Sequence, residues 1–207
     1  MNVIIGSVTA DLLVQNKTVW ADNDGDGFRQ KNLVFTDTPA TVSVGGNGGN
    51  SAYVLAGLGA PTALCGAVGQ DALGDMLVNH LATRQVNLTG LTRIRSHATS
   101  TSTILMRDAA NQTVLHHLGA TAEAQFSAIP PSLLKKAESL LATSFPLMPR
   151  FRAGGFSAAL AQVKAAGGIT LLDIGPAIGV WPMYPGLWTG TPVGPGIWPP
   201  GTGVRNL

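Results

Sequence analysis

The most informative segment of this sequence is Val44-Gly45-Gly46-Asn47-Gly48-Gly49-Asn50-Ser51-Ala52. Four glycines surround one asparagine, and a second asparagine, Asn50, opens an apolar helical pattern. Because glycine has no side chain and tolerates positive φ, such a run lets the backbone come close to a ligand. Asn50 is placed either to cap the following helix or to contact that ligand. The segment therefore predicts a binding loop that leads into a helix.

Segments on both sides continue the pattern. They are Val3–Asp11, an apolar strand with a turn and an aspartate; Gly66–Gly74, a second glycine-containing run; Thr99–Met106 with Gly119-Ala120; and Ile169–Asp173, a strand that ends in aspartate. In this order they resemble the ribokinase-type (phosphofructokinase-B) carbohydrate kinases over residues 1–175.

The resemblance implies an α/β fold, with a ribokinase-like parallel-sheet core covered by helices. It also implies a small β-lid, built from segments at about 14–44 and 97–118, that shields a phosphoryl transfer from water. The residues expected to hold the sugar are Asp11, Gly45, Gly46 and Asn50, with Asn47 as a further candidate. The implied activity is phosphorylation of a sugar hydroxyl with ATP and Mg²⁺, and a homodimer through the lid is a further expectation. Nucleoside kinases share the first signature, so a nucleoside substrate stays open.

Periodicity supports alternating strands and helices. Strands are expected at Val3–Ile5, Thr62–Val68 and Ile169–Asp173. Helices are expected at Asn50–Leu58, after Asp71 (Leu73, Met76, Leu77, His80, Leu81), after Pro131 (Leu133, Leu134, Ala137, Leu140, Leu141) and at Phe156–Ala166. Thr101–Arg107 and Gln112–Leu118 are expected to pair as a hairpin. This alternation predicts a parallel sheet with helices on both faces. Asp11 would then lie at the carboxyl end of a parallel strand, where open α/β sheets bind ligands.

Composition excludes several classes of protein. The chain has 207 residues with 13 Lys and Arg against 11 Asp and Glu, so it carries no basic footprint for nucleic acid. It has no apolar run of the roughly 18 residues that a membrane span needs. Its one cysteine, Cys65, lies in an apolar segment and is expected to be a buried, unreactive thiol. A single cysteine cannot form an internal disulfide, so the composition suits the reducing cytoplasm.

Three other motifs favour ordinary structure over a metal site. Asp22–Gly27 imitates the start of an EF-hand loop, but position 12 is Leu33, where a bidentate Glu is required. A solvated turn is the better interpretation. His116 and His117 are adjacent, so on a strand they point to opposite faces and are expected to be ordinary strand histidines. His80 is expected to be partly buried on its helix.

The sequence changes character at its end. Residues 176–207 are rich in Pro, Gly and Trp, and no helical or strand period survives there. Either a lost reading frame or a native Pro-rich tail would account for them, and we expect this segment to be disordered. The family's second signature, Asp-Thr-x-Gly-Ala-Gly-Asp, is absent from the sequence. Because that signature carries the catalytic base and the anion hole, no catalytic residue is assigned here. The C-terminal part of the fold is expected to be missing. The alternative function is therefore a catalytically silent sugar-binding protein.

Overall fold

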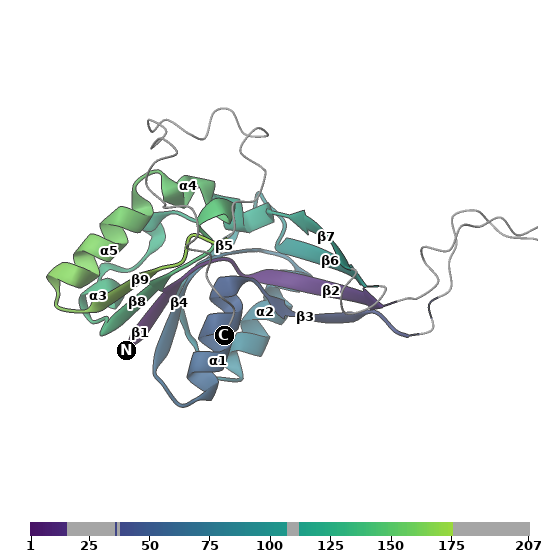
Figure 1. Cartoon of the computed structure of the whole chain (residues 1–207), viewed down its shortest axis with the longest axis horizontal. Coiled ribbons are helices and arrows are strands. Elements are labelled where there is room, and N and C mark those ends of the chain that lie inside the picture. The colour runs from purple at the N-terminus through teal and green to yellow at the C-terminus, as the bar shows by residue number, and fades with distance from the viewer. Residues whose placement is uncertain (16–35, 37, 107–111, 176–207) are drawn as a thin grey trace, which may run out of the picture. The chain divides into compact units, whose positions relative to one another are not determined.

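Five parallel strands form the central sheet. A computed structural model of the chain describes residues 1–15, 36, 38–106 and 112–175, all within one compact unit that spans Met1–Pro176 (Figure 1). The sheet has the order β5-β4-β1-β8-β9, and each neighbouring pair is parallel. The strands are β1 (Asn2–Ile5), β4 (Thr62–Gly69), β5 (Asn87–Ile94), β8 (Ser139–Ala142) and β9 (Ile169–Leu172).

Helices cover both faces of this sheet (Figure 1). On one face lie α1 (Asn47–Gly57) and α2 (Ala72–Ala82), and on the other α3 (Pro131–Lys135), α4 (Pro149–Arg152) and α5 (Gly155–Ala165). Short 3-10 helices span Gly119–Glu123, Phe126–Ala128 and Phe145–Leu147. The predicted helix-covered parallel sheet is confirmed.

Strand β4 shows why the sheet is central. All eight of its residues are buried. Alternate side chains enter opposite cores, Cys65 the core with α5 and Leu64 the core with α1 and α2. Cys65 is fully buried, and burial raises the pKa of its thiol to about 12. The predicted buried thiol is therefore confirmed.

A second sheet of four strands, the lid sheet, has the order β3-β2-β6-β7. Its strands are β2 (Thr9–Gln15), β3 (Thr41–Gly45), β6 (Ser100–Met106) and β7 (Gln112–His117). Strand β2 pairs parallel with β6 and antiparallel with β3, and β6 pairs antiparallel with β7. The predicted hairpin arms are confirmed. Ala10 and Val44 join the core under α1 and α2, which fixes the base of the lid sheet to the central sheet.

The structure corrects three local predictions. The helix after Pro131 ends at Lys135, and Leu140 and Leu141 belong to β8, because a short apolar run suits a buried strand as well as a helix. Helix α1 begins at Asn47 with Gly46 as its N-cap, so Asn50 is inside the helix.

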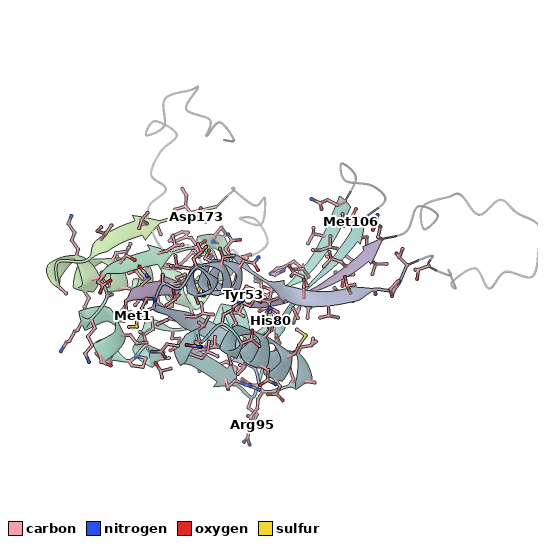
Figure 2. All side chains as sticks on the ribbon, turned by 90° about the horizontal axis from the view of Figure 1, so that it is seen from below. Met1, Tyr53, His80, Arg95, Met106 and Asp173 are labelled. Carbon is pink, nitrogen blue, oxygen red and sulfur yellow. The ribbon has the colours of Figure 1, made fainter. Side chains whose placement is uncertain are left out.

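The third correction concerns His80. Its side chain is exposed, and its ring stacks on Tyr53 with centroids 4.5 Å apart (Figure 2). The buried face of α2 is centred on Leu77 and Leu81, whereas Leu73, which the periodicity also predicts to be on that face, is 36% exposed.

Other predictions lie outside the described residues. These are the turn at Asp22–Gly27, the hairpin turn at residues 108–111, and the segment 176–207. The division at residue 175 stays a prediction. Among the described helices, none is long and apolar enough to cross a bilayer.

Candidate functional site

The candidate site lies where the lid sheet meets the central sheet. Strand β1 ends at Ile5, and after three residues the chain enters the lid sheet as β2, which carries Asp11. The sequence predicted Asp11 at the carboxyl end of a parallel strand. The structure places it inside β2 of the lid sheet instead. Strand β3 ends at Gly45, and α1 follows immediately.

Asp11 and Gly45 are brought into direct contact. A Cβ atom built on Gly45 would overlap the carboxylate of Asp11. Glycine at position 45 therefore allows the strand end to pass beside the carboxylate, and a larger residue would displace it.

One oxygen of Asp11 lacks a partner. Asp11 Oδ1 is buried and makes no hydrogen bond with any residue that the structure describes. Burial raises the pKa of Asp11, although a hydrogen bond from Ser102 and the charge of His116 act in the opposite direction. A desolvated carboxylate with a free acceptor is costly unless a donor reaches it. The site is thus prepared for a hydrogen-bond donor such as a hydroxyl group.

Gly46 connects the loop to the helix. It has φ 78°, and a Cβ atom on it would lie 2.6 Å from the carbonyl oxygen of Ser7. That carbonyl accepts a hydrogen bond of 3.0 Å from the amide of Gly49 in the first turn of α1. Both the positive φ and the lack of space require glycine here.

Asn47 belongs to a different set of contacts. Its Nδ2 donates to Thr143 Oγ1 over 3.4 Å, and Thr143 Oγ1 donates to Asp173 Oδ2 over 2.7 Å. Two predicted features far apart in sequence, Asn47 and the strand-end Asp173 (Figure 2), are thus linked through Thr143. Sequence reasoning missed Thr143, although it directly follows the buried strand β8, where ligand-facing residues of parallel sheets occur.

Ser7 and Ser144 join the two strand ends. Their hydroxyl oxygens are 2.8 Å apart, and the amide of Ser7 donates to Ser144 Oγ over 3.0 Å. Ser144 is buried and adopts a left-handed conformation with φ 60°. A non-glycine residue in this conformation is strained, so the surrounding contacts hold it in place.

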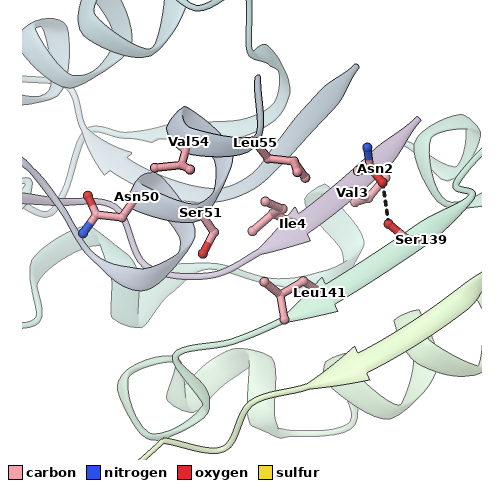
Figure 3. Close-up of a pocket in the computed structure, with 9 residues that line it drawn as sticks. All are labelled: Asn2, Val3, Ile4, Asn50, Ser51, Val54, Leu55, Ser139 and Leu141. Carbon is pink, nitrogen blue, oxygen red and sulfur yellow. Dashed lines mark hydrogen bonds between the residues drawn. The ribbon is translucent and has the colours of Figure 1, made fainter. Parts of the chain in front are cut away.

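Asn50 lies at the edge of a hollow, with its amide directed away from the hollow's floor (Figure 3). This hollow of about 420 Å³ lies between α1 and strands β1 and β8 (Figure 3). Its floor is formed by Ile4, Leu55 and Leu141, and Asn50 lies at one end. Asp11 and the glycines of the loop do not line it. The structure therefore brings Asp11 and Gly45 together and places Gly46 and Asn47 in the adjoining turn. Asn50 follows in the first turn of α1, and its contact with a ligand stays a prediction.

The described residues do not fit a nucleotide–metal site. Both carboxylate oxygens of Asp173 are engaged within the chain, Oδ2 by Thr143 and Oδ1 by the amide of Gly175 at 2.9 Å. No three His, Cys, Asp or Glu side chains in the described ranges are grouped to hold a metal ion.

The helix-covered parallel sheet with its small lid sheet is a ribokinase-like fold. Residues 1–173 match the family model described as pfkB family carbohydrate kinase. The chain belongs to this family.

Solved structures share the fold. The ribokinase of Arabidopsis thaliana, complexed with ribose and ATP, is 21% identical with a TM-score of 0.67 over 84% of this chain and 53% of its own. The ribokinase of Thermotoga maritima is 22% identical with a TM-score of 0.63, over 86% and 54% of the two chains. The adenosine kinase of Sinorhizobium meliloti is 22% identical with a TM-score of 0.66, over 83% and 55%. The chain thus spans about half the length of these relatives.

Proposed function

We propose that the described part of the chain is the sugar-binding half of a pfkB-type kinase, in which Asp11 accepts hydrogen bonds from sugar hydroxyls. The observation that carries this proposal is the buried Oδ1 of Asp11 beside Gly45, which no residue in the described ranges partners. An ionised carboxylate only accepts, and it can receive two hydroxyl donors at once. Gly45 and Gly46 keep the wall of the site free of side chains, and Asn47 and Asn50 are the further candidates for polar contacts.

The full reaction of this class is the transfer of a phosphoryl group from ATP, with Mg²⁺, to a sugar hydroxyl. Such a transfer depends on positioning and on electrostatic stabilisation of the transferring group. The Asp-Thr-x-Gly-Ala-Gly-Asp signature that would supply the base and the anion hole is absent from the 207 residues. We therefore propose that these residues by themselves bind sugar without phosphorylating it.

A nucleoside is the second candidate substrate. The adenosine kinase of Sinorhizobium meliloti shares this fold with about the same TM-score as the two ribokinases. A nucleoside carries vicinal ribose hydroxyls, which could donate hydrogen bonds to Asp11 as those of free ribose would. The affinities for sugars and for a nucleoside must therefore both be measured to separate the two substrate classes. A dimer through the lid sheet stays a prediction.

Calorimetric titration of the purified chain with D-ribose, D-fructose and adenosine tests the proposal. We expect binding of at least one of them, with a loss of tenfold or more in Asp11→Ala, since a hydrogen bond to a charged group contributes about 1.5–3 kcal/mol. Asp75→Ala is the matched control, because Asp75 is an exposed aspartate that pairs with Arg93 on the surface. Unchanged affinity in Asp11→Ala would refute the assignment of Asp11.

A further inference from the structure

Three polar residues, one of them Asp11, form a row across one face of the lid sheet. In the strand register, Asp11 on β2 is opposite Ser102 on β6, and Ser102 is opposite His116 on β7. Residues directly opposite on neighbouring strands project from the same face of a sheet. Asp11, Ser102 and His116, here called the polar row, therefore share the face that carries the candidate site.

One hydrogen bond and one strand pairing connect the polar row. Ser102 Oγ lies 3.1 Å from His116 Nδ1, and Ser102 is opposite Asp11 in the register, where donation from its hydroxyl acts to lower the pKa of Asp11. Ser102 is 8% exposed, so water competes little for its hydroxyl. An ionised carboxylate has no proton to give, so Ser102 donates its single proton to Asp11.

This proton count fixes the state of the His116 ring. With its own proton committed to Asp11, Ser102 accepts from His116, and Nδ1 must carry a hydrogen. In the neutral imidazole Nε2 is then an acceptor, and in the imidazolium both nitrogens donate. Because Asp11 takes the proton of Ser102, Ser102 on the neighbouring strand sets the tautomer of His116.

The surrounding charges favour the neutral ring. Burial lowers the pKa of His116; the nearby charge of Asp11 acts to raise it, and His117 acts to lower it further. Strand β6, the described partner of β7, contributes no titratable side chain of its own. Asp11 from β2 and His117 from β7 are therefore the titratable groups that act on His116 in the described part. The lowered pKa of His116 favours the neutral ring, in which Nε2 is an acceptor.

We propose that His116 is a positioning residue for Asp11, acting through Ser102, and that its Nε2 is a second acceptor for a hydroxyl of the polyhydroxy ligand. The inference rests on the proposed function and extends it, because it places two acceptors, a carboxylate and an imidazole, on one face of the lid sheet. It revises the interpretation of His116 as an ordinary strand histidine. His117, which projects from the opposite face, has no such role.

Two substitutions separate positioning from contact. His116→Asn retains an N–H donor near the position of Nδ1, so the link to Ser102 and Asp11 survives while the Nε2 acceptor is lost. Ser102→Ala cuts the link and leaves both ends in place. His117→Asn is the matched control, since it makes the same change on the adjacent residue of the same exposed strand.

Calorimetry with D-ribose and adenosine between pH 5 and pH 8 is the test. For whichever compound the wild type binds, we expect His116→Asn to weaken binding about three- to tenfold at neutral pH, the effect of one hydrogen bond between uncharged groups. Wild-type binding should weaken as the ring is protonated below pH 6.5, its ordinary pKa, and His116→Asn should lose that part of the pH dependence. Ser102→Ala should move the loss of binding to higher pH, because Asp11 loses the bond that favours its charged form. His117→Asn should bind as the wild type does.

The outcomes distinguish this inference from the proposed function. If Asp11→Ala loses affinity but His116→Asn keeps both wild-type affinity and pH profile, the role of His116 is refuted and the sugar site stands. An equal loss in His117→Asn would also refute it. If the wild type binds neither compound, the proposed function and this inference are both overturned. Nitrogen NMR of the ligand-free chain gives an independent check: the Nδ1–H tautomer supports the polar row, and the Nε2–H tautomer contradicts it.

Discussion

Replacing Asp11 with asparagine should separate the stability of this protein from its binding activity. The carboxylate has one buried oxygen without a partner among the described residues, and burial raises its pKa above the ordinary 3.8. Asparagine has nearly the same shape, keeps an oxygen that can accept from Ser102, and carries no charge to desolvate. We therefore expect Asp11→Asn to fold at least as stably as the wild type at neutral pH, while sugar affinity falls tenfold or more.

The size of the effect follows from the cost of the unpaired acceptor. Leaving a buried polar group unsatisfied costs about 1–3 kcal/mol. Because Asp11 is only partly buried, solvent screening keeps the gain near the lower end, about 1 kcal/mol. For a domain of this size, about 1 kcal/mol corresponds to a rise of about 2–4 °C in Tm.

The pH dependence has a definite sign. A carboxyl group whose pKa is raised on folding stabilises the fold fully below its unfolded pKa, and this contribution is lost as the pH rises through the folded value. The Tm of the wild type should therefore fall relative to that of Asp11→Asn as the pH increases from about 4, the unfolded pKa, to 8. Thermal unfolding followed by circular dichroism across this range measures it. An Asp11→Asn protein that is less stable than the wild type at pH 7–8, by a margin that grows with pH, would refute the reasoning.

Three further predictions concern the loop, the cap of α2 and catalysis. Gly46→Ala should destabilise the fold by about 1–3 kcal/mol more than Gly59→Ala, by urea unfolding; both glycines have positive φ, but only the Cβ at position 46 meets a neighbour, and overpacking adds that cost. Asp71→Ala should cost about 2–3 kcal/mol, since Asp71 caps α2 at Gly74 and accepts two bonds from Thr99. Burial alone would raise the pKa of Asp71, but these hydrogen bonds lower it. The difference in unfolding free energy between the wild type and Asp71→Ala should therefore shrink as the pH falls below 3.8, and a difference that does not change with pH would contradict the assignment. Finally, a coupled ADP-release assay with the purified chain should detect no sugar-dependent turnover, and clear turnover that disappears in Asp11→Ala would show that a base and an anion hole exist elsewhere.

The sequence by itself determined the features that depend on neighbours along the chain. The apolar run at Thr62–Val68 predicts a strand buried on both faces, and β4 is that strand. Asp71 before an apolar stripe predicts a helix cap, and its carboxylate accepts from Gly74. These signals are local, because capping and burial periodicity operate over a few residues. Where two local signals agree equally well with the same run, as at Leu140 and Leu141, the sequence leaves the choice open and the tertiary structure makes it.

Tertiary structure alone decided the contacts between distant segments. The sequence predicted Asp11 as a ligand contact, but it could not show that Ser102 and His116 share its face, because strand register is set by pairing between segments far apart in the chain. The bridge from Asn47 through Thr143 to Asp173 is of the same kind. A shift of one residue in any of these pairings would send the side chains to the opposite face, and only the packing of the whole core excludes that shift.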